Sequence, residues 1–491
     1  MLYIGIDLGT SAVKLLLMDA SGKICKTVSR AYPLSFPAPG WSEQAPEDWL
    51  RQTLDGMAEL VANCDRSSVA GIGIGGQMHG LVALDVNDQV IRPAILWNDG
   101  RTAAETEWLN DEIGRIRLTA WTANIAFAGF TAPKLLWLRK HEPENYARIR
   151  KIMLPKDYLV YMLSGVHSTD LSDASGTLLL DVQHRQWSSP MLEICGLTLE
   201  QLPALHESYE AVGTLKPEYA KMLGLPSTVK IAAGAGDNAA AAVGTGTVGN
   251  GRCNISIGTS GTIFISSSAF GVDSHNALHA FAHADGHYHL MGCMLSAAAC
   301  NSWWMDKILG STDYTGQQAQ ITDQMLGHNT VYYLPYLMGE RSPHNDPAAR
   351  SVFVGMSMDT TRAQMTQAVL EGVAFAMRDS REIARSLGLA VTRSKICGGG
   401  AKSPLWKKIF ANVLGLQLET VETEEGPGYG GAILAAVACG AFDSVQQATD
   451  ALVRISGTVE PDPGLTDLYA QRYAQFRQIY PALKPLFPIL A

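Results

Sequence analysis

The sequence predicts an α/β protein made of two related halves that pack on either side of a cleft. One observation is an internal repeat, in which a strand leads into a Gly-Thr-Ser turn and a second strand: IGIDLGTSAVKLL near the start and ISIGTSGTIFI in the middle of the chain. Another is the length of 491 residues, which is enough for two domains. No Pro-, Ser- or charge-rich linker separates the halves, so we expect residues 1–245 and 246–491 to form two domains in contact.

The elements of the first half follow from apolar runs between turns. Pro46 is expected to start a helix, because proline suits the first helical position and DWLRQTLDGMAELV places apolar residues on one face. Further helical segments are expected in KLLWLRKHEPENYARI and KDYLVYMLSG. Strands are expected at Leu2–Asp7, Ala12–Asp19, Lys23–Tyr32, Val69–Ile74, Leu81–Asp85 and from Val90.

Around residue 230 the strand pattern restarts. Strands are expected at Val229–Ala233, Cys253–Ile257 and Ile263–Ser266, and LWKKIFANVLG reads as a helix. The segment YAQRYAQFRQIYPALKPLF near the end is predicted to be an amphipathic helix that packs on the protein itself.

The composition argues against several kinds of partner. The chain has 38 basic and 47 acidic residues and a net charge of -9, with no basic block, which argues against nucleic acid. No apolar run is long enough to cross a membrane, and MLYIGIDLGT lacks the basic region of a signal peptide. The eight cysteines are scattered without a C-x-x-C pair, which is typical of a reduced, cytoplasmic protein.

The segment GIGIGG (71–76) matches the dinucleotide fingerprint G-x-G-x-x-G. A dinucleotide site needs a helix directly after the glycines, but QMHGLVALD reads as a turn and a strand. We therefore interpret GIGIGG as a strand whose glycines allow close packing, and we place Gln77, Met78 and His79 in the cleft. An NAD-dependent oxidoreductase stays as an alternative that only the glycine patterns support.

The segment GAGDNA (234–239) follows a strand and opens a helix, but no acidic residue stands about twenty positions further on to bind a ribose. Asp237 would occupy the place of a dinucleotide phosphate, which its charge would repel. A carboxylate at this point suits proton abstraction from a hydroxyl group or a magnesium site. A helix N-cap is a compatible structural role.

Three glycine turns are suited to phosphate, because each presents backbone N–H groups. DLGTS (7–11) adds a carboxylate and two hydroxyl groups, GTSGT (258–262) repeats the turn, and GGGA (398–401) lies between a strand and a helix. Since the turns are divided between the two halves, together they indicate a nucleotide held in the cleft.

GFTAPKLLWLRKH (129–141) and SVFVGMSMDTTRAQMTQAVLE (351–371) resemble the two signature stretches of the FGGY family of carbohydrate kinases. The resemblance covers almost the whole chain. QMHG, ILWNDGR, LPKDYL, GAGDNAAAAVG and GERSPHNDP are most similar to the members that phosphorylate the ketopentose D-xylulose. The resemblance implies two ribonuclease-H-like domains of the actin/hexokinase type that flank a deep cleft. It also implies sugar binding mainly by residues 1–245, ATP binding mainly by residues 246–491, Mg²⁺ as a cofactor and a homodimer.

The resemblance also implies roles for individual residues. Asp237 is the implied catalytic base, and Asp7 and Asp237 are the implied carboxylates near the metal. The implied sugar contacts are Gln77, Met78, His79, Trp97, Asn98, Asp99, Arg101 and Asn238. The implied ATP contacts are Gly9, Thr10, Ser11, Lys14, Gly258, Thr259, Gly399, Gly400 and Ser403.

Two departures bear on the acceptor. Glycerol kinases carry an Arg-Glu pair where this chain has QMHG, which argues against glycerol. TANIAFA, before GFTAPK, differs from the segment expected in close D-xylulose kinases, so another ketopentose or a polyol is the alternative acceptor. A second alternative is an ATP-binding member of the superfamily without transfer activity. The loop GERSPHNDP (339–347) is predicted to take part in closing the cleft over the sugar.

Two other groups of residues stand out. The histidine-rich segment fits a helical metal site by spacing, but HAFAH also alternates like a strand and no cysteine or second carboxylate completes a ligand set, so we expect a structural or surface role. Its histidines are His275, His279, His283, His287 and His289. The pair Trp303–Trp304 fits adenine stacking or the core, and we expect at least one of the two in the core.

Overall fold

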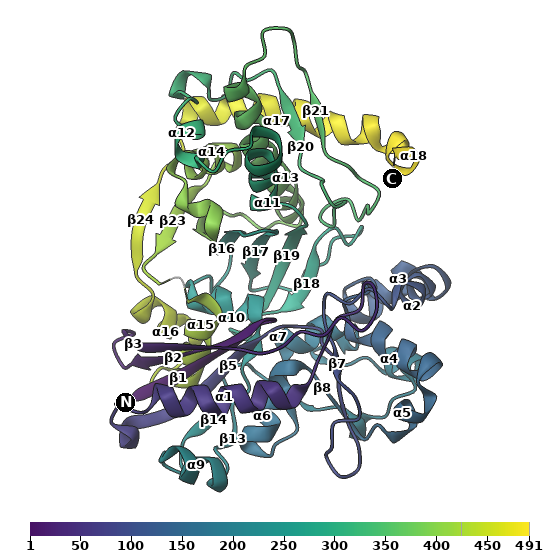
Figure 1. Ribbon diagram of the computed structural model, residues 1–491, viewed down its shortest axis with the longest axis vertical. Coiled ribbons are helices and arrows are strands. Elements are labelled where there is room, and N and C mark those ends of the chain that lie inside the picture. Colours follow the sequence, from purple (N-terminus) through teal and green to yellow (C-terminus); the bar gives the residue numbers. More distant parts are fainter. Residues whose placement is uncertain (424, 491) are drawn as a thin grey trace.

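The computed structural model describes residues 1–423 and 425–490, and in these ranges each of two lobes is built around a seven-stranded mixed sheet (Figure 1). The sheet of the lower lobe has the order β13 (Ala211–Thr214), β14 (Lys230–Ala232), β5 (Val69–Gly76), β1 (Leu2–Leu8), β2 (Ala12–Asp19) and β3 (Ile24–Ala31), with β15 (Ala235–Gly236) added beside β5. The sheet of the upper lobe has the order β18 (His279–Ala282), β19 (Tyr288–Met294), β17 (Gly261–Ser267), β16 (Cys253–Ile257), β22 (Arg393–Cys397), β23 (Gln417–Val421) and β24 (Ile455–Val459).

The two sheets share a common order, which confirms the internal repeat. In each, the two strands that flank the Gly-Thr-Ser turn form an antiparallel hairpin, β1–β2 and β16–β17. The first strand of each hairpin then pairs in parallel with a later strand, β5 or β22, and that strand pairs in parallel with another, β14 or β23. Parallel strands end at the same edge of a sheet, so the hairpin turn and the ends of the parallel strands lie together in each lobe.

Most of the predicted strands and helices are confirmed, and two predictions are wrong. No strand begins at Val90, whose only strand pairing in the described ranges is an isolated antiparallel bridge to Leu84. The chain reverses direction at Asp88, which has a left-handed conformation, and only one residue then pairs with β6. β6 (Val82–Leu84) pairs instead with β8 (Lys151–Met153). The helical segment after Lys134 is interrupted at residue 142, since Pro143 has no N–H to continue the hydrogen bonding, and it forms α4 (Thr131–His141) and α5 (Pro143–Arg148).

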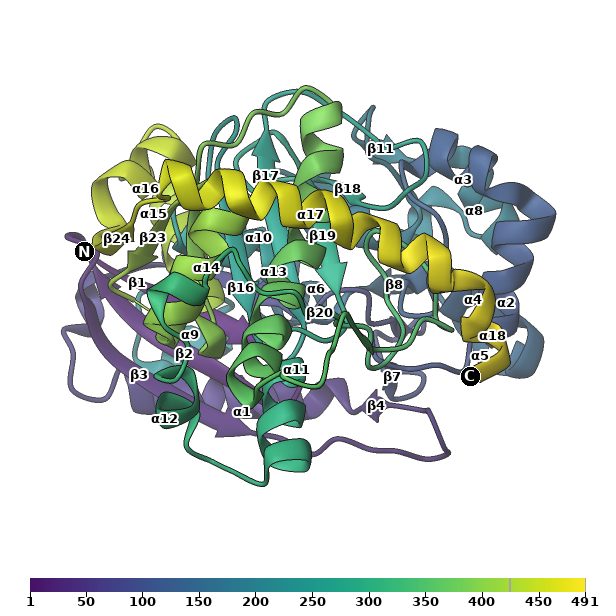
Figure 2. The same ribbon diagram turned by 90° about the horizontal axis from the view of Figure 1, so that it is seen from above.

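Helices cover both sheets. In the lower lobe α1 (Pro46–Leu60) packs against β2 and β3, and in the upper lobe α13 (Arg362–Ser386) packs against β17 and β19 and α14 (Pro404–Leu414) against α13. α17 (Pro463–Leu483) runs along the outside of the upper lobe, and its buried side chains Tyr469, Tyr473 and Phe476 confirm the predicted packing on the protein itself (Figure 2). The remaining helices include α2 (Ala103–Trp108), α3 (Arg115–Thr122), α6 (Pro155–Ser164), α7 (Leu171–Ala174), α8 (Ser189–Cys195), α9 (Pro217–Leu223), α11 (Ala298–Trp303), α12 (Tyr314–Gln318), α16 (Val445–Leu452) and α18 (Phe487–Leu490).

The glycines of GIGIGG allow a helix to pack unusually close to the lower sheet. α15 (Gly426–Ala438) crosses β1 and β5, although it comes from the second half of the chain (Figure 1). A Cβ atom on Gly73 would lie 2.0 Å from the carbonyl oxygen of Gly431, and one on Gly5 would lie 1.9 Å from that of Gly428. No side chain fits at these positions, so the packing interpretation of GIGIGG is confirmed and the dinucleotide interpretation is wrong.

The histidine-rich segment is a strand pair rather than a helix. HAFA forms β18, which pairs with β19, and His279, His283 and His289 are buried among Phe264 and Phe281. In the described ranges no three His, Cys, Asp or Glu side chains are grouped as a metal site would need. All eight cysteines are described and are free thiols. No helix in the described part of the chain has the length and apolar character needed to span a membrane.

Candidate active site

Two carboxylates stand at the same edge of the lower sheet. Asp7 near the end of β1 and Ala235 of β15 both lie opposite Gly75 of β5, on its two sides. Asp237 follows β15 directly and is the first residue of α10 (Asp237–Gly244). The three parallel strands therefore bring Asp7 and Asp237 together although they are far apart in the chain. The N-cap of α10 is Gly236, so the expectation that Asp237 caps this helix is wrong.

The pKa values of both carboxyl groups are raised. Burial raises the pKa of Asp237 to about 6, although the backbone N–H and the Nδ2 of Asn238 donate to its Oδ1 at 2.7 and 2.9 Å and lower it. Burial and the charge of Asp237 raise the pKa of Asp7 to about 7, against the opposing charge of Lys14 on the neighbouring strand. Asp237 is thus ionised at neutral pH yet more basic than a surface aspartate, as a general base must be. The repulsion between the two carboxylates favours a cation beside them.

His79 is a neutral imidazole held in a fixed orientation. Its Nδ1 lies 2.7 Å from the carbonyl oxygen of Gly176 and donates to it, and its ring stacks on Phe130 at 4.6 Å. Burial, followed by the charge of Lys134, lowers the pKa of His79 to about 3. His79 also has a φ of 69°, a left-handed conformation that is uncommon outside glycine and concentrates at functional sites. The Nε2 of this tautomer is a hydrogen-bond acceptor.

The signature residue Lys134 supports the backbone at His79. Its Nζ donates to the carbonyl oxygens of His79 at 2.8 Å and Gly129 at 2.7 Å, and the Thr131 hydroxyl donates to the same His79 oxygen at 3.1 Å. Lys134 is fully buried. The left-handed residue is thus stabilised by the N-terminal end of α4.

The segment that holds this site together, residues 170–176, was not predicted from the sequence. Asp170 caps α7, Ser172 Oγ accepts from the N–H of Gly236 at 3.2 Å, and Ser175 Oγ accepts from the N–H of Ala282 in the upper lobe at 2.9 Å. Gly176 must be glycine, because a Cβ atom there would lie 2.5 Å from the ring of His79. The cluster of Asp and Ser in DLSDASG could have indicated a capped turn, but not its position beside Asp237.

The first glycine turn is joined to the predicted sugar loop. The Thr10 hydroxyl donates to Gln77 Oε1 at 3.2 Å and accepts from Trp97 Nε1 at 2.9 Å. Gln77 is buried, and its Nε2 donates to Gln44 Oε1 at 3.2 Å. The fixed side chain of Gln77 therefore holds the Thr10 hydroxyl in place. Gly9, Ser11 and Lys14 lie at the accessible edge of the same hairpin, where Lys14 pairs with Glu425 at 3.7 Å.

Asp99 and Arg101 form a buried ion pair that stabilises the loop WNDGR. Arg101 donates from Nε and Nη2 to the two carboxylate oxygens of Asp99 at 2.9 and 2.7 Å, and its guanidinium lies 3.8 Å from the ring of Trp41. Both side chains are fully buried. Their functional groups are engaged inside the protein, so they support the loop, whereas Trp97 and Asn98 are exposed on its outer side.

Met78 and Asn238 flank the carboxylate of Asp237. A Cβ atom on Gly236 would lie 3.0 Å from the sulfur of Met78, so the Met78 side chain packs directly against the strand that leads to Asp237. The Nδ2 of Asn238 donates a hydrogen bond to Asp237 Oδ1. The structure thus brings Met78, His79, Asp237 and Asn238 together.

The second and third glycine turns are adjacent in the upper lobe. The carbonyl oxygens of Gly258 and Thr259 accept from the first N–H groups of α11, and Gly400 packs against Ile257, directly before Gly258. Gly399, Gly400 and Ser403 line a cavity of about 640 Å³. Pockets of this size accommodate small ligands such as a nucleoside.

Two further residues of this cavity were not predicted from the sequence. Asn301 lines it with a buried Oδ1 that has no hydrogen-bond partner, and Gln318 accepts from Ser403 at 2.6 Å. Trp304 is buried, with its Nε1 bonded to Thr366, and Trp303 packs against Tyr333, so the prediction that at least one tryptophan is in the core is confirmed.

Comparison with known proteins gives the class of this one. The model of the N-terminal domain of the FGGY family of carbohydrate kinases matches residues 2–244, and the model of the C-terminal domain of this family matches residues 253–439. The chain belongs to the FGGY family of carbohydrate kinases. This confirms the two-domain fold of the actin/hexokinase type and the prediction of a carbohydrate kinase.

Relatives of the chain extend over its full length. The xylulose kinase of Escherichia coli K12 is 41% identical over 99% of this chain and 100% of its own. The crystal structure of a xyloylose kinase from Brucella ovis is 40% identical, with a TM-score of 0.94 and coverage of 99% and 100%. A gluconate kinase from Lactobacillus acidophilus has the same TM-score at 25% identity, covering 100% of this chain and 99% of that one. Backbone similarity alone therefore does not distinguish the acceptor.

Proposed function

We propose that this kinase transfers the γ-phosphoryl group of ATP to O5 of D-xylulose and forms D-xylulose 5-phosphate. The observation that carries the proposal is the carboxylate of Asp237, raised in pKa and held by Asn238 beside the neutral His79. The 41% identity to a xylulose kinase over the full chain supports D-xylulose as the acceptor. In this proposal residues 1–245 bind mainly the sugar and residues 246–491 mainly ATP.

The chemistry of the acceptor is compatible with these side chains. A 2-ketopentose that closes into a ring uses O5 for the ring, so only its open chain offers a free O5 hydroxyl. Asp237 accepts the proton of this hydroxyl as the oxygen attacks phosphorus, and His79 Nε2 accepts a hydrogen bond from another hydroxyl of the sugar. Met78 provides the apolar contact beside them.

The residues present fit a magnesium nucleotide. Mg²⁺ prefers carboxylate oxygens and phosphate and keeps several waters, and Asp7 and Asp237 offer the carboxylates. When bound, the ion neutralises phosphate charge. Gly9, Thr10, Ser11, Lys14, Gly258 and Thr259 supply N–H, hydroxyl and ammonium groups for phosphate oxygens. Gly399, Gly400 and Ser403 border the cavity for the nucleoside, where the unpaired Asn301 Oδ1 is an acceptor for the amino group of adenine.

The test is ADP release in a coupled assay with D-xylulose, D-ribulose, xylitol and gluconate as acceptors. We expect the largest kcat/KM with D-xylulose, and phosphorus NMR of the product should place the ester at C5. Faster turnover of another acceptor would keep the kinase and change the substrate. No acceptor-dependent ADP release would leave an ATP-binding protein without transfer activity as the better hypothesis.

A further inference from the structure

We propose that Arg341 recognises the carbonyl oxygen of the open-chain ketose and so distinguishes a ketose from the corresponding polyol. This inference rests on the proposed function and adds a specificity residue from the upper lobe. It begins with the loop GERSPHNDP, whose backbone is fixed on the strand β19. The N–H of Ser342 donates to the carbonyl oxygen of Cys293 at 2.9 Å, and the N–H of Cys293 donates to Ser342 Oγ at 3.0 Å.

The guanidinium of Arg341 and the ring of His79 lie on the same aromatic cluster. Arg341 is 5.2 Å from the centroid of Phe127, Phe127 is 5.4 Å from Phe130, and Phe130 stacks on His79 at 4.6 Å. His279 of β18 closes the group at 5.0 Å from Phe127. Arg341 comes from the upper lobe and His79 from the lower, so two residues from different lobes border one site.

Arg341 has donors to offer a ligand. In the parts of the chain that the structure describes, it forms no ion pair with a carboxylate. The Oε1 of the neighbouring Glu340 accepts from the N–H groups of Leu295 at 2.9 Å and Arg341 at 2.7 Å, and burial raises the pKa of this carboxyl group to about 8 against the charge of Arg341. The imidazoles of His79 and His279 beside Arg341 are uncharged, since burial holds the pKa of both below its usual value. A guanidinium that forms no ion pair within hydrogen-bond distance, and that lies beside neutral rings, is suited to a polar ligand atom that only accepts hydrogen bonds.

The site has two ends of opposite character. Met78 and His79 lie between them. A Cβ atom on Gly236, directly before Asp237, would meet Met78, and one on Gly176 would meet both Met78 and His79. From His79, the rings of Phe130 and Phe127 lead to Arg341. An extended ketopentose with O5 at Asp237 therefore directs its C2 carbonyl toward the end where Arg341 lies. A carbonyl oxygen has two lone pairs and no proton, which matches the guanidinium, whereas a C2 hydroxyl brings a proton that finds no acceptor on Arg341.

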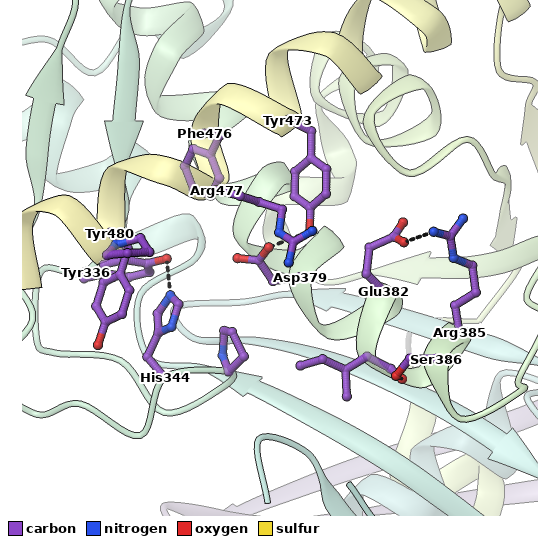
Figure 3. A pocket seen from close by; sticks show the side chains of 13 residues that line it. Tyr336, His344, Asp379, Glu382, Arg385, Ser386, Tyr473, Phe476, Arg477 and Tyr480 are labelled. Atoms are coloured by element: carbon purple, nitrogen blue, oxygen red, sulfur yellow. Dashed lines mark hydrogen bonds and ion pairs between the residues drawn. The ribbon is translucent and has the colours of Figure 1, made fainter. Parts of the chain in front are cut away.

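The opposite side of the loop is anchored to the outer helix α17 (Figure 3). His344 stacks on Tyr480 at 3.6 Å, and its Nε2 is hydrogen-bonded to the hydroxyl of Tyr336 at 3.0 Å. The Tyr480 hydroxyl donates to Asp346 at 2.7 Å. These contacts border a cavity of about 550 Å³ behind the loop and hold both sides of the turn that carries Arg341. Arg341 is thus presented from a fixed backbone, as a specificity residue requires.

The test compares D-xylulose with xylitol, the polyol with the same carbon chain, in the wild type and in Arg341→Gln. The readouts are kcat/KM for D-xylulose and the inhibition constant of xylitol as a competitor of D-xylulose. We expect Arg341→Gln to lower kcat/KM for D-xylulose about 10- to 100-fold, as for a lost charged hydrogen bond, and to change the xylitol constant by less than about fivefold. Arg341→Lys, which keeps the charge but not the fork of donors, should fall between the two.

Arg362→Gln, at an exposed position in the first turn of α13, is the matched control and should leave both constants unchanged. The melting temperature shows that each variant is folded, and Arg341→Lys carries the test if Arg341→Gln does not fold. Equal weakening of D-xylulose and xylitol, or no change for D-xylulose, would overturn the assignment. Failure of the wild type to phosphorylate D-xylulose would refute the proposed function instead, so the two outcomes are separable.

Discussion

The proposed sugar side and the proposed nucleotide side of the site are built in different ways. On the sugar side, Met78, His79 and Asp237 are held by hydrogen bonds, stacking and close packing, and their chemistry lies in the side chains. On the nucleotide side, Gly258, Gly399 and Gly400 present backbone, and the cavity beside the last two is open. Substitutions should therefore act differently on the two sides. On the sugar side a changed side chain alters the chemistry, whereas on the nucleotide side an added side chain occupies space needed by the ligand.

Asp237→Asn should have the largest effect, because it removes the base without changing its shape. We expect kcat to fall by about 10²–10⁴, the usual contribution of general base catalysis, and the KM for the sugar to change much less. The wild-type kcat should decline tenfold per pH unit below about pH 6, since the raised pKa of Asp237 means that the proton-accepting form is lost there. This acid limb should be absent in Asp237→Asn. Near-normal turnover in the variant would remove Asp237 from the role of base.

His79→Asn should affect the sugar side alone. Asparagine tolerates the left-handed backbone conformation and can still donate to Gly176, but it does not place an acceptor where Nε2 lies. We expect the KM for D-xylulose to rise about 10- to 100-fold, since a hydroxyl loses its partner in a site built for it, while the KM for ATP stays the same. Titration of both substrates in the coupled assay measures this. Parallel loss of ATP affinity would show that His79 is a structural residue and that the two sides are not independent.

Asp7 and Asp237 were expected together only from the family resemblance, since they are far apart in the chain. The structure gives the physical reason: β1, β5 and β15 run parallel, so both residues reach one edge of the sheet. The sequence did not show that the side chains of Asp99 and Arg101 are buried whereas those of Trp97 and Asn98 are exposed. All four stand in one short loop, and only the packing against Trp41 decides which side chains face inward.

Contacts between the two lobes could not be predicted from local sequence patterns. α15 covers the lower sheet from the far end of the chain, and Arg341 reaches the aromatic cluster of His79 from the upper lobe. Neither has a signal at its own position, because the contact depends on how the two halves pack. The glycines of β5 were interpreted as close packing, but the helix that requires them could not be identified from their pattern.

Gly399→Ala and Gly400→Ala separate ligand space from packing on the nucleotide side. A Cβ atom on Gly399 meets nothing within 4 Å, whereas one on Gly400 would lie 2.4 Å from Ile257 and 2.9 Å from Trp406. We expect Gly399→Ala to raise the KM for ATP with an unchanged melting temperature, and Gly400→Ala to destabilise the fold by about 1–3 kcal/mol through overpacking. Thermal unfolding and ATP titration of both variants test the pair. An unchanged KM in Gly399→Ala would mean that ATP does not approach this turn.

The smallest expected effect is on the stability of the protein and concerns Asp7. Its negative charge destabilises the folded protein when no ligand is bound, because it is buried beside Asp237. Its folded pKa of about 7 is above the unfolded value of 3.8, so the folded state binds the proton more tightly. The resulting stability is fully present below the unfolded pKa and is lost as the pH rises through about 7. Asp7→Asn removes this dependence, so its melting temperature should match that of the wild type below about pH 4, exceed it increasingly as the pH rises to about 7, and be about 1–3 °C higher at pH 8.

Magnesium and ATP should reverse this order at pH 8. The ionised Asp7 then has a cation beside it, so the wild type should gain more stability from the pair of ligands than Asp7→Asn does. Adding ATP with EDTA, which leaves the nucleotide but removes the metal, is the control and should stabilise both proteins alike. A difference in melting temperature that is the same at every pH would show that Asp7 carries no unfavourable charge. The nucleotide side would then depend on backbone alone, without the carboxylate that links it to Asp237.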